Sequence, residues 1–285
     1  MKLNYLIIGG DSKVGNYICD ILDSKKNYFL RTSRKIQNKN TLFLDLKAPV
    51  KFKVPQNINY CFFLAGITDY KKCEKLDYAK DVNVKNTFYL IKKLIKAGIH
   101  VNFISSNTVF GGKTKKISEH DRKYPNFSYA KYKSECEDKI LKWTLENRYQ
   151  KLLSITRLTK VLEKNTKPLP FWRKNINDDK LIFSFYDYYF SPISIEYASK
   201  SLLKISRSKS HGLFHLSNQK SISYYDFSKL YFKKKHKLIK KKSIKEIKNI
   251  KFYYKSIYSN LMMKRTQKII NIHPESIKSL LKKLY

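Results

Sequence analysis

The first fifteen residues, MKLNYLIIGGDSKVG, constrain the fold of this chain more than any other stretch. An apolar run at residues 6–8 leads into a glycine-containing turn, and apolar residues recur at helical spacing from Lys13 to Leu22. A strand, a glycine turn and a helix in this order present free backbone N–H groups and the positive end of a helix dipole to a phosphate. The chain is therefore expected to begin with a dinucleotide-binding unit.

The turn departs from the GxxGxxG spacing at its middle position. Gly9 and Gly15 occupy the outer positions, and Ser12 stands where the central glycine would be. A glycine pattern alone is weak support, but its position between a strand and a helix strengthens the interpretation. The sequence leaves open whether Ser12 crowds a pyrophosphate or contacts it through its hydroxyl.

A second predicted strand, residues 27–31, bears on the choice of nicotinamide cofactor. In sites of this type an acidic residue near this strand binds the ribose 2′-hydroxyl, whereas a nearby arginine accommodates a 2′-phosphate. Residues 27–44 contain no Asp or Glu, but they contain Arg31 and Arg34. This favours NADP over NAD, although NAD stays open, and the alternative interpretation is an exposed basic loop.

Strand-like and helix-like segments alternate over the first 160 residues. The further strands are predicted at residues 41–46, 60–65, 100–104 and 151–158, and the longer helices at 77–97 and 128–147. Such alternation predicts an α/β fold, in which a parallel sheet is covered by helices on both faces.

Beyond Thr159 this alternation stops. An extended aromatic segment, a helix at residues 195–205 and a short strand at 212–216 precede a lysine-rich end with a mostly helical pattern. We therefore predict a nucleotide-binding domain at residues 1–158 and a smaller cap at 159–285. Residues 191–217 of the cap are expected to return to the main sheet.

The formal net charge of +38 would suit a nucleic-acid or membrane partner. The basic residues, however, are 52 lysines and only 8 arginines, spread between apolar positions along most of the chain. We interpret them as solvated faces and predict neither a specific nucleic-acid partner nor a membrane partner. The densest run, residues 233–242, could touch phosphates, but surface background is the favoured interpretation.

The four cysteines are scattered and form no CxxC pair, which favours a reducing cytoplasm and argues against structural zinc or disulfides. No metal site is predicted. No secretory signal is visible, and no apolar run approaches the roughly 20 residues that a membrane helix needs. A cytoplasmic location is expected.

Tyr129 and Lys133 form a Y-x-x-x-K pair that would lie one helical turn apart on the same face. An ammonium beside a phenol stabilises the phenolate and makes the tyrosine usable as a general acid or base. Four such pairs occur in this tyrosine- and lysine-rich chain, about the number expected by chance, so spacing alone decides nothing. Tyr129 is distinguished by following a strand that ends at Ser105-Ser106, because ligands bind outside the carboxyl ends of parallel strands.

Further short motifs accompany these residues in a characteristic order. They are Gly9 to Gly15, Asp45-Leu46, Leu64-Ala65-Gly66, Val82-Asn83-Val84 with Thr87, Ser105 to Phe110, Tyr129 to Lys133, Arg157, Ser191-Pro192-Ile193, Gly212 to Ser217, and Leu261. With them the chain resembles the extended short-chain dehydrogenase/reductases that act on nucleotide sugars. The branch it resembles is the dTDP-4-dehydrorhamnose reductase-like, sugar-nucleotide-binding group.

The resemblance implies a Rossmann-type doubly wound parallel sheet with a smaller, mostly helical C-terminal substrate-binding cap. It also implies a catalytic triad of Ser106, Tyr129 and Lys133. Together with the two arginines, the residues expected at the NADP or NAD site are Gly9, Ser12, Lys13, Val14, Gly15, Arg31, Arg34, Asp45, Leu46, Leu64, Ala65, Gly66, Asn83, Tyr129 and Lys133.

The activity so implied is NAD(P)H-dependent reduction of a 4-keto nucleotide sugar in surface polysaccharide biosynthesis, by a protein that could be a homodimer. An epimerase with retained NAD is one alternative, and a non-catalytic nucleotide-binding regulatory protein is another. Dehydration is disfavoured, because Asn107-Thr108 follows Ser106 where sugar dehydratases carry Asp-Glu. Phe110 stands where the family usually has tyrosine.

Overall fold

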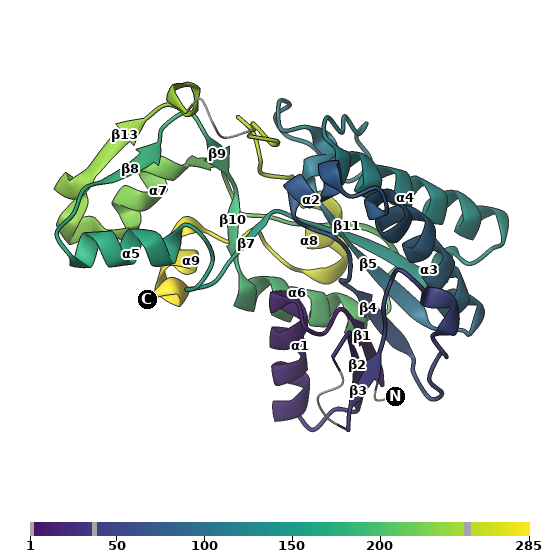
Figure 1. Cartoon of the computed structure of the whole chain (residues 1–285). Helices are drawn as coiled ribbons and strands as arrows, with labels where there is room; N and C mark the ends of the chain where they lie inside the picture. The colour runs from purple at the N-terminus through teal and green to yellow at the C-terminus, as the bar shows by residue number, and fades with distance from the viewer. Residues whose placement is uncertain (1–2, 36–38, 248–251) are drawn as a thin grey trace.

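A computed structural model describes residues 3–35, 39–247 and 252–285 of the chain. Within these ranges seven strands form one parallel sheet in the order β11-β6-β5-β4-β1-β2-β3 (Figure 1). The strands are β1 (Tyr5–Ile8), β2 (Phe29–Ser33), β3 (Thr41–Phe43), β4 (Tyr60–Phe63), β5 (His100–Ser106), β6 (Leu153–Leu158) and β11 (Gly212–Leu216). The expected doubly wound α/β fold is confirmed, and β11 lies at one edge of this sheet.

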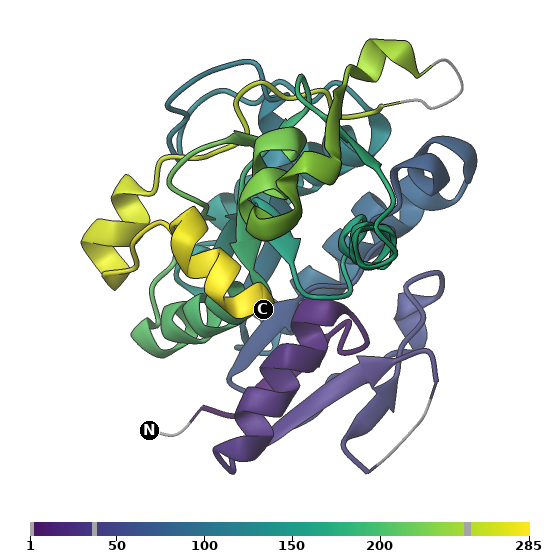
Figure 2. The ribbon, with the colours of Figure 1, turned by 90° about the vertical axis from the view of Figure 1, so that its left-hand side faces the viewer.

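Both faces of the sheet are buried, since successive side chains of a strand point to opposite faces. Tyr5 and Ile7 of β1 pack into one hydrophobic cluster, and Leu6 and Ile8 pack into the other. Helices α1 (Lys13–Ser24) and α6 (Ile195–Ser208) supply buried side chains to the first cluster. Helices α3 (Thr87–Lys96) and α4 (Ser128–Glu146) cover the opposite face. Figure 2 shows α1 lying across the N-terminal strands of the sheet.

The second half of the chain builds a smaller lobe beside the sheet (Figure 1). Its core gathers apolar side chains from elements far apart in the sequence. These elements are α5 (Leu169–Asn177), β8 (Ile182–Phe185), β9 (Tyr189–Phe190), β12 (Ile222–Ser223), α7 (Tyr224–Tyr231), β13 (Ile239–Lys242) and α9 (Ile277–Leu284). The parallel pair β7 (Lys160–Leu162) and β10 (Pro192–Ser194) lies between this lobe and the sheet, and α8 (Lys264–Ile270) packs near β11.

The end of the chain contains less helix than predicted. Of the described residues beyond 223, only α7, α8 and α9 are α-helical, while residues 239–242 form β13 and pair with β8. The sequence of β13, Ile-Lys-Lys-Lys, has no periodicity that distinguishes a strand from a helix, and pairing with β8 decides the outcome. In the described residues no helix is both long and apolar enough to cross a bilayer.

Candidate functional site

The glycine turn is pressed against the end of β4. Gly9 has a positive φ of 88°, and a Cβ there would stand 2.7 Å from the backbone nitrogen of Ala65. A Cβ on Gly15 would stand 2.5 Å from the carbonyl oxygen of Gly9. Both glycines are therefore required by close backbone approach, as in a turn that wraps a phosphate.

Ser12, at the irregular position, caps the following helix. Its hydroxyl accepts a hydrogen bond from the backbone N–H of Gly15 at 3.0 Å, as an N-cap residue does. The N–H groups of Lys13 and Val14, at the first two helical positions, have no intrahelical acceptor. Together with the helix dipole they form a phosphate-binding end that Ser12 organises rather than blocks.

A cavity of about 600 Å³ opens beside this turn, at the carboxyl ends of β1, β2, β3 and β4. Eight of the residues predicted for the cofactor site line it: Gly9, Ser12, Arg34, Asp45, Leu46, Leu64, Ala65 and Gly66. Its volume and its place outside the carboxyl ends of parallel strands are those of a nucleotide site. The residues present thus fit a nicotinamide dinucleotide.

Three of the predicted cofactor residues take other partners. The ammonium of Lys13 pairs with the Glu163 carboxylate and also donates to the carbonyl oxygen of Asn165. The guanidinium of Arg31 pairs with Asp11, so of the two arginines only Arg34 lines the cavity. Asn83 is buried and does not line the cavity.

Asn83 instead holds the segment that follows β4. Its side chain accepts from the backbone N–H of Ile67 at 2.8 Å and donates to the carbonyl oxygen of Ile67 at 3.0 Å. Asn83 lies in a π-helical turn, Asp81–Asn86, immediately before α3. Such turns are rare and often occur at functional sites. This one directs Asn83 toward Ile67, which lines the cavity.

Ser106, Tyr129 and Lys133 are brought together where β5 ends and α4 begins. The Lys133 ammonium donates to the carbonyl oxygen of Ile104 in β5 at 2.8 Å and lies 4.4 Å above the Phe103 ring. A hydrogen bond links Ser106 with Tyr129. The hydroxyl of Ser106 also accepts from the backbone N–H and the hydroxyl of Thr108, at 3.2 and 3.0 Å.

Burial dominates the protonation of this trio. It raises the pKa of Tyr129 well above its ordinary value, the nearby Cys73 thiol adds to the rise, and the hydrogen bond with Ser106 opposes it. Burial lowers the pKa of Lys133 to about 8, against the opposing influence of Cys136 and Glu137. Tyr129 is therefore a phenol at neutral pH, which is the form that donates a proton.

An aromatic cluster that the sequence analysis missed encloses Tyr129. The ring of Tyr70, from α2 (Tyr70–Lys75), lies 5.2 Å from that of Tyr129 and 4.8 Å from that of Phe127. Tyr253, from the irregular segment before α8, stacks edge-on against Tyr70 at 6.3 Å. No local sequence pattern predicts these contacts, because the three segments are far apart in the sequence and become neighbours only in the folded chain.

A buried ion pair anchors α4 beside the trio. The guanidinium of Arg157 in β6 donates to the Glu137 carboxylate at 2.7 and 3.1 Å, and both side chains are buried. Burial acts to raise the pKa of Glu137, but the Arg157 charge and hydrogen bonds outweigh it and hold this pKa below its usual value. Glu137 lies one helical turn beyond Lys133, so the pair positions the helix that carries the trio.

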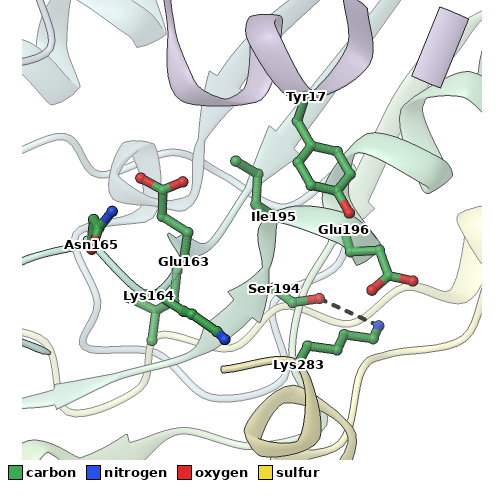
Figure 3. A pocket seen from close by; sticks show the side chains of 9 residues that line it. Tyr17, Glu163, Lys164, Asn165, Ser194, Ile195, Glu196 and Lys283 are labelled. Atoms are coloured by element: carbon green, nitrogen blue, oxygen red, sulfur yellow. Dashed lines mark hydrogen bonds between the residues drawn. The ribbon is translucent and has the colours of Figure 1, made fainter. Parts of the chain in front are cut away.

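A second cavity, of about 280 Å³, lies between α1 and the smaller lobe. Figure 3 shows its labelled lining, with Tyr17 from α1 facing Glu196 and with Lys283 bonded to Ser194. The Lys283 ammonium also pairs with the buried Glu275 carboxylate at 2.9 Å. Ser106, Tyr129 and Lys133 line neither this cavity nor the larger one. The smaller cavity also lacks the residues of the glycine turn, and we interpret it as a seam between the two lobes.

Comparison with known protein families gives a match over the whole chain, because the model of the RmlD substrate binding domain covers residues 1–285. The chain belongs to the RmlD substrate-binding domain family. It is thus a member of the extended short-chain dehydrogenase/reductases, a family of NAD(P)-dependent oxidoreductases. Among curated proteins no sequence matches it significantly.

Solved structures share the fold of this RmlD-family chain at low sequence identity. A hypothetical dTDP-4-dehydrorhamnose reductase from Sulfolobus tokodaii is 21% identical, with a TM-score of 0.77, and the match covers 97% of this chain and 99% of that one. MoeE5, solved in complex with UDP-glucuronic acid and NAD, is 14% identical (TM-score 0.77; 98% and 97% covered). The UDP-glucose 4-epimerase of Thermotoga maritima is 16% identical (TM-score 0.77; 99% and 97% covered).

Proposed function

We propose that this protein reduces a 4-keto nucleotide sugar with NADH or NADPH. The observation that carries the proposal is the grouping of Ser106, Tyr129 and Lys133 in a family of NAD(P)-dependent oxidoreductases. The cavity at the carboxyl ends of the strands supports it, since it fits the nucleotide. Structural relatives include a hypothetical dTDP-4-dehydrorhamnose reductase and a protein solved with a UDP-sugar and NAD, which supports a nucleotide-sugar substrate.

When bound, a reduced nicotinamide supplies hydride to the carbonyl carbon of the sugar. Tyr129 then gives its phenolic proton to the carbonyl oxygen, so that a C–H and an O–H bond form as the C=O double bond becomes single. Tyr129 is protonated at neutral pH, as a proton donor must be, while its raised pKa makes it a weaker acid that depends on stabilisation of the phenolate. Lys133, one helical turn further along α4, supplies an ammonium that stabilises the phenolate left after transfer.

Ser106 is suited to stabilise the oxygen on which negative charge develops. Its hydroxyl oxygen already accepts two hydrogen bonds from Thr108, and its proton faces the Asn107 carbonyl oxygen at a long 3.5 Å. This proton is the one that bonds to Tyr129 in the absence of substrate, and it can turn to the substrate oxygen, where a positioned donor lowers the barrier.

The test is Tyr129→Phe with Tyr89→Phe as its matched control. Tyr89 begins another Y-x-x-x-K pair on an exposed part of α3, so the control makes the same chemical change away from the site. We expect Tyr129→Phe to reduce kcat for a 4-keto nucleotide sugar by about 10²- to 10⁴-fold. NADH binding, followed by fluorescence, should persist. Undiminished reduction by the Tyr129 variant would remove the basis of the proposal.

The alternative is an epimerase that uses the same trio and keeps its NAD. The fold shared with the Thermotoga maritima epimerase supports this alternative. Stoichiometric NAD in the purified protein, with interconversion of two sugars and no net consumption of NADH, would favour the epimerase over the reductase.

A further inference from the structure

Asp11, in the glycine turn, reaches across to the end of β2. Its Oδ1 accepts from Nη2 of Arg31 at 2.8 Å, and its Oδ2 accepts from the Ser33 hydroxyl. The Ser33 hydroxyl oxygen in turn accepts from the backbone N–H of Lys35 at 2.8 Å. The carboxylate is therefore held by two side chains of β2, one of which is fixed in turn by the loop that follows.

Arg31 is confined by this arrangement. Its side chain is only 16% exposed, and it packs against Gly10, where a Cβ would stand 2.9 Å from the Arg31 Nε. The Nε itself is buried and has no hydrogen-bond partner among the described residues. The side chain thus cannot swing freely toward a ligand, and its one charged partner in the described structure is Asp11.

Asp11 is more open than Arg31, with 48% of its side chain exposed, and it lines the large cavity. Each carboxylate oxygen has two acceptor positions, and each uses one for the bond described. One acceptor position on each oxygen therefore remains for a ligand. In this kind of fold an acidic residue near the end of the second strand binds the ribose hydroxyl, and Asp11 is hydrogen-bonded to Ser33 at the end of that strand.

We propose that Asp11 selects the cofactor at the ribose 2′-position, accepting a 2′-hydroxyl and disfavouring a 2′-phosphate. The proposal rests on the cofactor site of the proposed function. A 2′-phosphate entering here meets the Asp11 charge and must break the ion pair to engage Arg31. Among the described residues that line the cavity, the exposed Arg34 is then the guanidinium left without an ion pair, and Lys47 and Lys72 are the other cations. The consequence is a preference for NAD(H), although Arg31 lies in the second strand and Arg34 directly follows it.

The experiment measures binding of NADH and NADPH by fluorescence titration at fixed salt, without a sugar substrate. We expect the wild-type protein to bind NADH more tightly than NADPH. Asp11→Asn, which keeps the shape and removes the charge, should shift the affinity ratio toward NADPH by about tenfold, the equivalent of one pKa unit of interaction energy. Asp20→Asn is the matched control, since it removes one carboxylate from the exposed side of α1.

In Asp11→Asn the Arg31 guanidinium loses its ion-pair partner and can itself bind a phosphate. The double variant Asp11→Asn with Arg31→Met separates this effect from the loss of the Asp11 charge. The double variant should keep the part of the NADPH gain that comes from removing the Asp11 charge and lose the part that comes from the released Arg31. An unchanged ratio in Asp11→Asn, or an equal change in Asp20→Asn, would overturn the assignment of Asp11 and leave the reductase proposal standing. A wild-type protein that binds neither dinucleotide would overturn both.

Discussion

Replacing Lys133 with methionine should stabilise the fold at neutral pH. Lys133 is buried and its pKa falls from an ordinary 10.5 to about 8, so the folded state holds the charged ammonium at a cost. A shift of about 2.5 pKa units corresponds to about 3 kcal/mol at 1.36 kcal/mol per unit. Losing the hydrogen bond to Ile104 offsets about 1 kcal/mol of this, which leaves a net gain of about 2 kcal/mol.

The difference in unfolding free energy between wild type and Lys133→Met should depend on pH. Between pH 8 and 10.5 the unfolded chain binds more protons at Lys133 than the folded chain does, so wild-type stability rises with pH in that window. The full cost is present below pH 8 and fades above it. The advantage of Lys133→Met should therefore be largest at pH 7 and should disappear toward pH 10.5.

The assay is urea unfolding followed by circular dichroism at several pH values, with Lys131→Met as the control. Lys131 lies two residues earlier on the same helix and is exposed, so the same substitution there should change the unfolding free energy little. A Lys133→Met protein that is less stable than wild type at pH 7, or a difference that does not vary with pH, would refute the reasoning. Loss of turnover in the stabilised variant would show that the buried charge is kept for catalysis.

Two further predictions concern residues that support the site. Ser12→Ala should lose about 1 kcal/mol of unfolding free energy, because the Gly15 N–H loses its cap, whereas Ser12→Gly should lose only a few tenths; equal losses in denaturant titrations would argue against the capping role. Arg157→Met should lose about 3–5 kcal/mol, because the buried Glu137 loses its guanidinium and keeps only Lys123 as an ion-pair partner among the described residues. Adding Glu137→Leu to that variant should recover much of the loss, and failure to recover it would mean that the pair is not the source.

The sequence by itself determined the architecture and most of the candidate site. A strand, a close-packed glycine turn and a helix in succession can adopt few local geometries. Parallel strands that are buried on both faces appear in the sequence as continuous apolar runs, so they can be recognised without knowledge of their neighbours. The carboxyl ends of such strands lie along one edge, so Ser106 and Tyr129 could be placed together before any contact was known. The order of the motifs then indicated the family, which the match over residues 1–285 confirms.

Tertiary structure decided what each charged or irregular residue does. Ser12 became a helix cap, Lys13 turned to Glu163, and Arg31 was paired by Asp11. The count of acidic residues after the second strand could not reveal this last contact, since Asp11 comes from a different loop, twenty residues earlier. Sequence patterns report which face of an element is apolar, whereas the partner of a polar side chain depends on loops that only the assembled sheet brings within hydrogen-bonding distance.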